Sequence, residues 1–262
     1  MLVMGWVETN HSGIIYEQCQ ELNNHRVVQG FSVRSSGNMA LHIGDDPNEV
    51  VARRESWLKA LGLRLEQLVA GVQVHGTRVA VIEKTAVGSG AFNIDGAIPE
   101  TDALVTKEPG IILATFTADC IPIFIYDPVT PAIGVVHAGW RGTIDGIATI
   151  TVKRMVDEFG TFPGDCLVAI GPSICGVCYR VDKQLAERFG KIHTQVVTED
   201  ELGYRIDLQT FNKLALIRIG VCSRHIYEAQ HCSNCQADRF FSYRADRGKT
   251  GRMMGIIALK NQ

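Results

Sequence analysis

The chain has 262 residues, of which 46% are hydrophobic and 21% charged, which suits one large α/β domain or two small ones. Its formal charge is −2 and its Lys and Arg residues are spread along the chain, so no basic block indicates a nucleic-acid partner. No apolar run approaches the roughly 18 residues of a transmembrane helix, so no membrane partner is expected.

The first residues lack the basic start, apolar core and small-residue cleavage site of a signal peptide. Eight cysteines in a chain of this length are too sparse for the disulfide framework of a secreted domain. They are better interpreted as thiols or metal ligands in a reducing compartment. A cytoplasmic location is therefore expected.

The first predicted helix spans roughly 46–62. Asp46 is placed to cap it, Pro47 fits its first turn, Glu49 has the spacing of a capping box, and Gly62 ends it. Three more helices are predicted, each ending at or just before a glycine, at roughly 143–159, 182–189 and 207–219.

Short runs rich in β-branched residues predict the strands. These runs cover residues 68–74, 78–83, 111–117, 121–126, 132–137, 166–171, 225–230 and 253–259. Residues 85–102, with several small-residue breaks and a proline, are predicted to form a long surface loop. This order of elements favours a mixed-sheet α/β (α+β) fold, and no stretch resembles a linker, so residues 1–262 are expected to form a single domain.

Three of these strands end next to a side chain that can bind a metal or act as a nucleophile, namely His75, Cys120 and His137. Two imidazoles and a thiolate suit Zn²⁺ and leave a fourth position open. The spacings of 45 and 17 residues match no short zinc motif. By residue type alone, the simpler interpretation is that the histidines cap strand ends and that the cysteine is a buried thiol.

The same residues allow two other kinds of chemistry. Cys120 could be a nucleophile with one histidine as its base, and Asp119 or a backbone carbonyl could orient the ring. Two histidines and a cysteine also ligate blue copper. A multicopper oxidase needs more histidine ligands than the eight histidines present, and the chain contains no His-x-His pair.

Two Cys-x-x-Cys pairs occur later in the chain, Cys175 with Cys178 and Cys232 with Cys235. Such pairs indicate structural zinc when they are about 15–20 residues apart. Here 54 positions separate Cys178 from Cys232. Packed or loop thiols are therefore the simpler interpretation, and a joint four-cysteine metal site is the alternative.

Several arginines lie among small residues that would let an anion approach. They are Arg34, Arg141, Arg244 and Arg252. Trp140 and Tyr243 could stack on a flat ring, although an aromatic residue at a strand end is more often part of the core. For each arginine taken alone, a structural or solvated role is the simpler interpretation.

Five motifs, in order, now identify a resemblance. They are VQVHG, TADCIPIFIYDP, AIGVVHAGWRGT, AIGPSICGVCYRV and FFSYRADRGKTGRMMGIIAL. The chain resembles the laccase-domain, or multicopper polyphenol oxidoreductase, family, now better described as purine nucleoside phosphorylase/adenosine deaminase enzymes. The resemblance runs from about Phe31 to the C-terminus.

The resemblance implies a single layered α/β/β/α domain and a catalytic metal, usually Zn²⁺, bound by His75, Cys120 and His137. It implies phosphorolysis of adenosine, inosine, guanosine and methylthioadenosine, together with deamination of adenosine. Purine nucleosides and phosphate are then the expected partners of a monomer or small homo-oligomer. The older laccase name reflects copper-dependent polyphenol oxidation, so Cu²⁺ is the alternative metal. A metal-free cysteine amidohydrolase using Cys120 and His137 is the alternative enzyme, and a metal-binding domain without turnover is the non-enzymatic one.

Expected site residues beyond the three metal ligands follow from the same motifs. Asp119 is the nearest candidate acid/base for deamination. The expected substrate contacts are Arg34, Gln73, Arg141 and Arg244. The family's early motif commonly reads Arg-x-Gly-Gly-Val-Ser, whereas this chain keeps Arg34 but continues with Ser35-Ser36-Gly37, so substrate preference can differ from that of the family.

Overall fold

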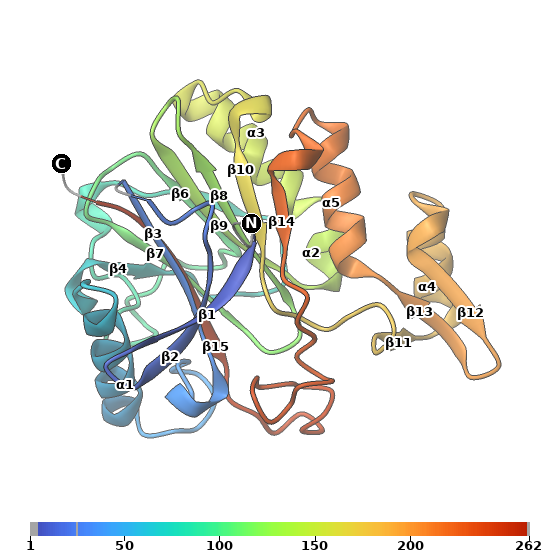
Figure 1. Cartoon of the computed structure of the whole chain (residues 1–262), viewed down its shortest axis with the longest axis horizontal. Helices are drawn as coiled ribbons and strands as arrows, with labels where there is room; N and C mark the ends of the chain where they lie inside the picture. Colours follow the sequence, from blue (N-terminus) through green and yellow to red (C-terminus); the bar gives the residue numbers. More distant parts are fainter. Residues whose placement is uncertain (1–4, 25, 261–262) are drawn as a thin grey trace.

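The computed structural model describes residues 5–24 and 26–260, and two six-stranded sheets lie face to face in it (Figure 1). The first sheet has the order β1 (Trp6–His11), β2 (Ile14–Cys19), β3 (Val27–Ser32), β15 (Met253–Leu259), β7 (Ile112–Thr117) and β4 (Leu68–Ala70). The second has the order β14 (Ile226–Glu228), β10 (Leu167–Ile170), β8 (Ile121–Asp127), β9 (Ala132–Ala138), β6 (Ala103–Thr106) and β5 (Val79–Val81).

A small third sheet has the order β11 (Arg180–Val181), β13 (Gly203–Ile206) and β12 (Val197–Asp200). The helices are α1 (Pro47–Ala60), α2 (Trp140–Ile144), α3 (Ile147–Phe159), α4 (Lys183–Gly190) and α5 (Leu208–Arg218). In Figure 1 the small sheet and α4 project from one side of the two large sheets.

Alternating side chains of the central strands fill three apolar layers. On β7, Ile112 packs in the cluster that contains Trp57 and Leu58 of α1, whereas Leu113 packs between the two sheets. On β8, Phe124 packs between the sheets, whereas Ile123 packs in the cluster that contains residues of α3 and α5. Because both faces of these strands are buried, their sequences are continuous apolar runs. The layers follow the order α/β/β/α, which confirms the predicted fold class.

Both large sheets are mixed. Most neighbouring strands are antiparallel, but β4 pairs with β7, β5 with β6 and β10 with β14 in parallel. The predicted helix over 143–159 is in fact two helices, α2 and α3, because Gly146 adopts a left-handed φ of 86° between them. The other three predicted helices agree with α1, α4 and α5.

The prediction that residues 85–102 form a surface loop is wrong for part of that segment. Ala91 is fully buried and Asp102 is 3% exposed. The segment is fastened to α1 by the buried Arg54, whose guanidinium donates hydrogen bonds to the carbonyls of Gly90 and Ala91. The end of the segment is held by the second sheet instead, where the N–H of His137 donates to the carbonyl of Asp102. Asp102 therefore lies beneath the site described below.

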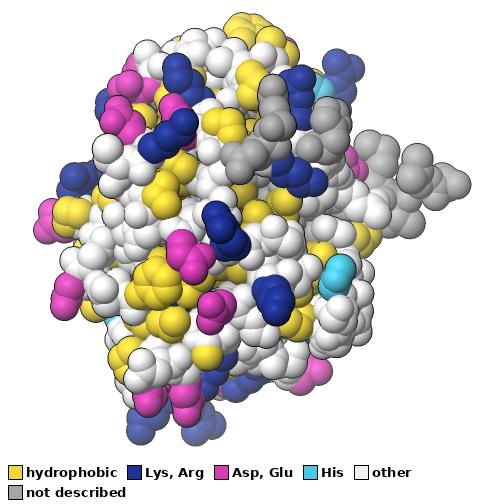
Figure 2. Space-filling model, turned by 90° about the vertical axis from the view of Figure 1, so that its left-hand side faces the viewer, with side chains coloured by type: hydrophobic (Ala, Val, Ile, Leu, Met, Phe, Trp, Pro, Cys, Tyr) yellow, Lys and Arg dark blue, Asp and Glu magenta, His cyan; other side chains and the backbone are white. Residues whose placement is uncertain are grey.

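The face shown in Figure 2 carries Lys and Arg side chains interspersed with Asp and Glu, and its described residues form no continuous basic patch. Among the described residues, no helix has both the length and the apolar character needed to cross a lipid bilayer.

Candidate metal centre and cavity

Antiparallel pairing of β8 with β9 brings Cys120 and His137 together. His137 is the penultimate residue of β9 and lies opposite Pro122 of β8. Cys120 immediately precedes β8, so the next step of the register places it opposite Gly139. Both side chains therefore stand on rigid strand ends of the second sheet.

His75 reaches the same place from a loop that Asp102 holds. The carboxylate of Asp102 accepts hydrogen bonds from three consecutive backbone N–H groups, those of Val74, His75 and Gly76, at 2.8–3.2 Å. His75 itself has a φ of 62°, a conformation that is costly for a residue with a side chain and that persists only where its surroundings enforce it. Asp102 supplies that enforcement.

The three side chains form one cluster. One ring nitrogen of His75, one ring nitrogen of His137 and the Sγ atom of Cys120 all lie within 4.8 Å of one another. A close approach of the backbone makes this cluster compact, because a Cβ on Gly139 would lie 2.5 Å from Cδ2 of His75. Glycine is therefore required at position 139 for His75 to occupy this place.

Asp102 also orients His137. Its Oδ1 lies 2.8 Å from Nδ1 of His137, and both side chains are buried. This contact occupies Nδ1 and leaves Nε2 to face Cys120 and His75. A carboxylate behind a histidine is the usual support of a metal-binding imidazole, because it fixes the ring and raises its basicity.

The electrostatics of the cluster favour a thiolate. Burial alone would raise the pKa of Cys120, but the neighbouring His137 and hydrogen bonds from His137 and His75 outweigh burial and lower this pKa to about 6. Burial alone would lower the pKa of His137, but the Cys120 thiolate and the hydrogen bond to Asp102 raise it to about 9. In the metal-free protein Cys120 and His137 are thus an ion pair at neutral pH.

These residues fit a metal ion. Two imidazole nitrogens and a thiolate are the donors that Zn²⁺ and copper prefer, whereas Mg²⁺ and Ca²⁺ prefer oxygen. The thiol already favours its deprotonated form, and the Asp102 carboxylate already supports His137. An ion held by these three residues at the floor of the cavity would keep a further position on the cavity side, as in catalytic rather than structural zinc sites.

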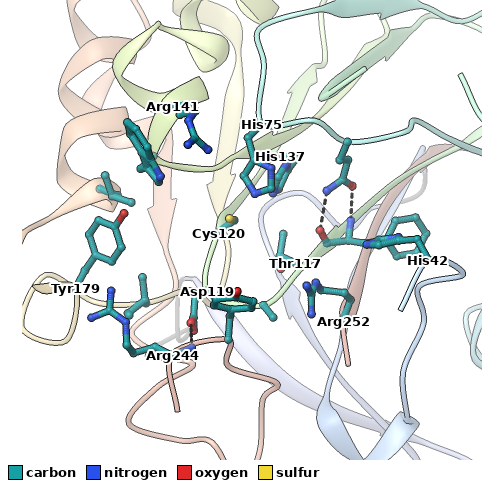
Figure 3. A pocket seen from close by; sticks show the side chains of 17 residues that line it. His42, His75, Thr117, Asp119, Cys120, His137, Arg141, Tyr179, Arg244 and Arg252 are labelled. Carbon is teal, nitrogen blue, oxygen red and sulfur yellow. Dashed lines mark hydrogen bonds between the residues drawn. The ribbon is translucent and has the colours of Figure 1, made fainter. Parts of the chain in front are cut away.

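The cavity above the cluster has a volume of about 520 Å³, within the range of small-molecule sites. Its lining includes the aromatic side chains of Phe116, Trp140, Tyr179 and Tyr243. Figure 3 shows Arg141, Arg244 and Arg252 arranged around the Cys120 thiol. The cavity therefore combines flat apolar walls with cationic groups above the cluster of His75, Cys120 and His137.

Asp119 lines the cavity and fastens another segment to it. Its Oδ1 accepts a hydrogen bond from the Ser233 hydroxyl and its Oδ2 accepts one from the Arg244 backbone N–H, at 2.6 and 2.7 Å. Asp119 has a φ of 83°, another enforced conformation. These contacts show a positioning role, and acid/base catalysis by Asp119 stays a prediction.

Three of the four expected substrate contacts line the cavity. The Arg141 guanidinium lies over the Trp140 ring. Arg244 donates to the carbonyls of Cys178 and Arg180. Gln73 uses its side-chain amide to bond both the N–H and the carbonyl of Phe116, so it positions the loop before His75.

Arg34 does not line the cavity. Its guanidinium pairs with Asp246 at 2.8 Å, donates to the carbonyl of Ala237 and lies against the Phe241 ring. These contacts engage the Arg34 guanidinium within the protein. They link the end of β3 to the 237–246 segment. The expectation of a substrate contact by Arg34 is therefore not supported.

Sequence reasoning missed three residues at this site: Asp102, His42 and Tyr179. Asp102 is the residue just before a strand, and its importance depends on the pairing of β6 with β9. His42 and Tyr179 line the cavity from distant segments. Burial, followed by the positive charge of Arg252, lowers the pKa of His42, so its imidazole is neutral at pH 7. The only signal in the sequence for any of these three residues is that Asp102 is an acidic residue directly before a buried strand.

Residues 25–260 match the family described as multi-copper polyphenol oxidoreductase laccase. The chain is 33% identical to purine nucleoside phosphorylase YlmD of Bacillus subtilis, covering 99% of this chain and 94% of that protein. It is 36% identical to adenosine deaminase RL5 of an unknown prokaryotic organism, covering 86% and 87%. The crystal structure of YlmD from Geobacillus stearothermophilus superposes with a TM-score of 0.92 at 34% identity, covering 97% of this chain and 99% of that one.

Proposed function

Because the chain belongs to the multi-copper polyphenol oxidoreductase laccase family, we propose that it is a single-domain, zinc-dependent purine nucleoside phosphorylase that also deaminates adenosine. Its substrates are adenosine, inosine, guanosine and methylthioadenosine, with phosphate as the second substrate in phosphorolysis. The observation that carries the proposal is the His75–Cys120–His137 cluster at the floor of a cavity with aromatic walls and unpaired arginines. The names of the relatives support the purine assignment.

His75, Cys120 and His137 would hold the zinc ion, and Asp102 would keep two of these ligands in place. When bound, zinc supplies a Lewis acid at the cavity floor. The protein's own part is to fix the ligands before substrate arrives, so that little reorganisation is needed during the reaction.

In phosphorolysis, phosphate must approach C1′ of the ribose while the purine departs. Arg141 and Arg244 are the proposed phosphate contacts, with Arg252 as a further one. Among the described residues, none of these three guanidinium groups forms an ion pair with a carboxylate within 4.0 Å, and each lines the cavity. A guanidinium without a carboxylate partner keeps an uncompensated positive charge, which suits phosphate oxygens.

The purine ring needs a flat apolar surface. Trp140 and Tyr179 both line the cavity. The Arg141 guanidinium lies over the Trp140 ring. The Arg244 guanidinium lies over the Tyr179 ring (Figure 3). We propose that they flank the base and exclude water from the glycosidic bond. Deamination uses the same base position, with Asp119 as the candidate acid/base.

We place this enzyme in the cytoplasm, as a monomer or small homo-oligomer. All eight cysteines are free in the structure, which supports a reducing compartment.

One alternative has a specific observation in its favour. Cys120, His137 and Asp102 have the arrangement of a nucleophile, its base and the group that orients the base. A metal-free cysteine amidohydrolase would use these three residues. The family's description names a second alternative, copper-dependent polyphenol oxidation.

The assay that separates these functions uses the purified protein with inosine plus phosphate, adenosine without phosphate, and a phenol with added Cu²⁺, each analysed by chromatography. We expect hypoxanthine from inosine only when phosphate is present, and inosine from adenosine. Stripping the metal with a chelator should abolish both reactions, and zinc should restore them.

His137→Ala tests the site, and His11→Ala, an exposed histidine of β1, is the matched control. We expect the first to lose zinc and activity and the second to keep both. Activity that survives metal removal and is lost on alkylation of Cys120 would instead establish the cysteine enzyme. Phenol oxidation without nucleoside turnover would establish the oxidase.

A further inference from the structure

The two Cys-x-x-Cys pairs, far apart in the sequence, lie together in the structure. They belong to the segments that follow β10 and β14, which are parallel neighbours in the second sheet (Figure 1). A further parallel bridge between Ser173 and Cys232 joins these segments beyond the strands. Parallel strands that end at one edge therefore deliver both pairs to one place. These are Cys175 and Cys178 from the first segment, and Cys232 and Cys235 from the second.

The four sulfur atoms have the spacing of a metal site and not of a disulfide. All four Sγ atoms lie within 4.8 Å of one another. The Sγ atoms of Cys178 and Cys235 are 3.3 Å apart, whereas a disulfide needs about 2.05 Å. A tetrahedral zinc ion with Zn–S distances of about 2.3 Å requires sulfur atoms roughly 3.8 Å apart. The four thiols are therefore close enough together for one such ion to contact all of them.

Backbone N–H groups point at the cluster. The Sγ of Cys232 accepts hydrogen bonds from the N–H of Cys235 at 3.4 Å and from the N–H of Cys175 at 3.3 Å. Each pair is also closed by a turn, since the N–H of Cys178 donates to the carbonyl of Cys175, and the N–H of Gln236 to that of Cys232. A turn over Cys-x-x-Cys places both sulfurs on one side, and amide donors stabilise a sulfur that carries negative charge.

We propose that Cys175, Cys178, Cys232 and Cys235 bind a second, structural zinc ion. Four protein ligands fill a tetrahedral shell and leave no position for substrate, so this site is closed, unlike the three-ligand cluster in the cavity. Each thiol releases its proton when the metal binds. The proposal is independent of the proposed function, because it rests on residues outside the cavity lining.

The second site would fasten one wall of the cavity. Ser233, within the second pair, donates to Asp119, the residue next to Cys120. Tyr179, next to Cys178, lines the cavity, and the Arg244 guanidinium bonds the Cys178 carbonyl. Zinc at the four cysteines would hold these groups at fixed positions relative to one another.

The experiment counts zinc in the full-length protein. Wild type should contain two zinc ions per chain, and the double variant Cys120→Ser/His137→Ala should contain one. The double variant Cys178→Ser/Cys235→Ser should also contain one, held in the cavity. Cys222→Ser, a half-buried free thiol outside both clusters, is the matched control and should keep two.

A second measurement does not depend on how well the four-cysteine variants fold. In the folded Cys120→Ser/His137→Ala protein, the four cysteines should resist alkylation until a chelator is added, as identified by peptide mass. Cobalt bound in place of zinc should show the thiolate-to-metal charge-transfer absorption of a tetrahedral cysteine site.

The proposal is overturned if the Cys120→Ser/His137→Ala protein contains no metal and its four cysteines react freely without chelator. It is equally overturned by a protein mass that reveals disulfides among these cysteines, or by iron in place of zinc.

Discussion

Replacing Asp102 with asparagine removes one negative charge from beneath the cluster of His75, Cys120 and His137 while keeping the size of the side chain. The carboxylate accepts four N–H donors: Oδ1 from His75 and His137, Oδ2 from Val74 and Gly76. Asparagine has a single acceptor oxygen, so two of the four donors would face an NH₂ group whichever way the amide is turned.

The magnitude follows from these contacts. The amide oxygen should keep the buried His137, which leaves the N–H groups of Val74 and Gly76 without an acceptor. Each of these two unsatisfied N–H groups lowers the free energy of unfolding by about 1 kcal/mol. This is the low end of the usual range, because both residues are partly exposed. Loss of the charged partner weakens the His137 hydrogen bond by roughly another 1 kcal/mol. We therefore expect the free energy of unfolding to fall by about 3 kcal/mol and zinc affinity to fall about 10–100-fold.

Urea unfolding of the metal-free protein measures the first quantity, and competition with a zinc-binding dye measures the second. Asp127→Asn is the control, because Asp127 is also buried and lies at the other end of β8, where only its Oδ1 accepts hydrogen bonds. That variant should keep wild-type zinc affinity. An Asp102→Asn protein with wild-type stability and wild-type zinc affinity would refute the assignment of Asp102 as the group that holds the cluster.

Three further predictions follow from the contacts of single residues. Gly139→Ala should lower zinc affinity and nucleoside turnover while the far-ultraviolet circular dichroism stays unchanged, because its Cβ would displace the His75 ring; unchanged zinc binding would contradict it. In the metal-free protein, the rate at which iodoacetamide alkylates Cys120 should rise with pH and inflect near pH 6, because the lowered pKa keeps the thiolate present until the pH falls through about 6. An inflection near pH 9 would contradict the ion pair with His137. Arg54→Met should lower the free energy of unfolding by at least about 3 kcal/mol in urea, because three carbonyls lose their donor; a loss under 1 kcal/mol would contradict the anchoring role.

Most of the strands that the sequence predicts are buried on both faces, although β5 and β14 are only partly buried. Runs such as 112–117 and 253–259 are continuous in apolar residues because helices or a second sheet cover each side. The strands β1 to β3 are not predicted, since polar residues interrupt them. Glu17 is fully buried in β2, and its partner Arg239 lies 222 positions away. No local pattern reveals such a partner.

The residues of the site likewise divide into those that the sequence reveals and those that depend on long-range contacts. His75, Cys120 and His137 are predictable because each stands beside the end of an apolar run. Asp102 is not, because its role depends on contacts with residues 26 to 35 positions away. The four cysteines show the limit of spacing arguments most clearly. Their separation in sequence favours isolated thiols, and the parallel pairing of β10 with β14 brings them together.

The central claim is that the cluster of His75, Cys120 and His137 makes this cavity a metal-dependent site for purine nucleosides. The most direct measurement is the yield of ribose 1-phosphate and hypoxanthine from inosine and phosphate, with the zinc-loaded and the metal-stripped protein. We predict equal amounts of the two products from the zinc-loaded protein and neither from the stripped one. Failure of the zinc-loaded protein to release hypoxanthine, or equal release by the stripped protein, would contradict the claim.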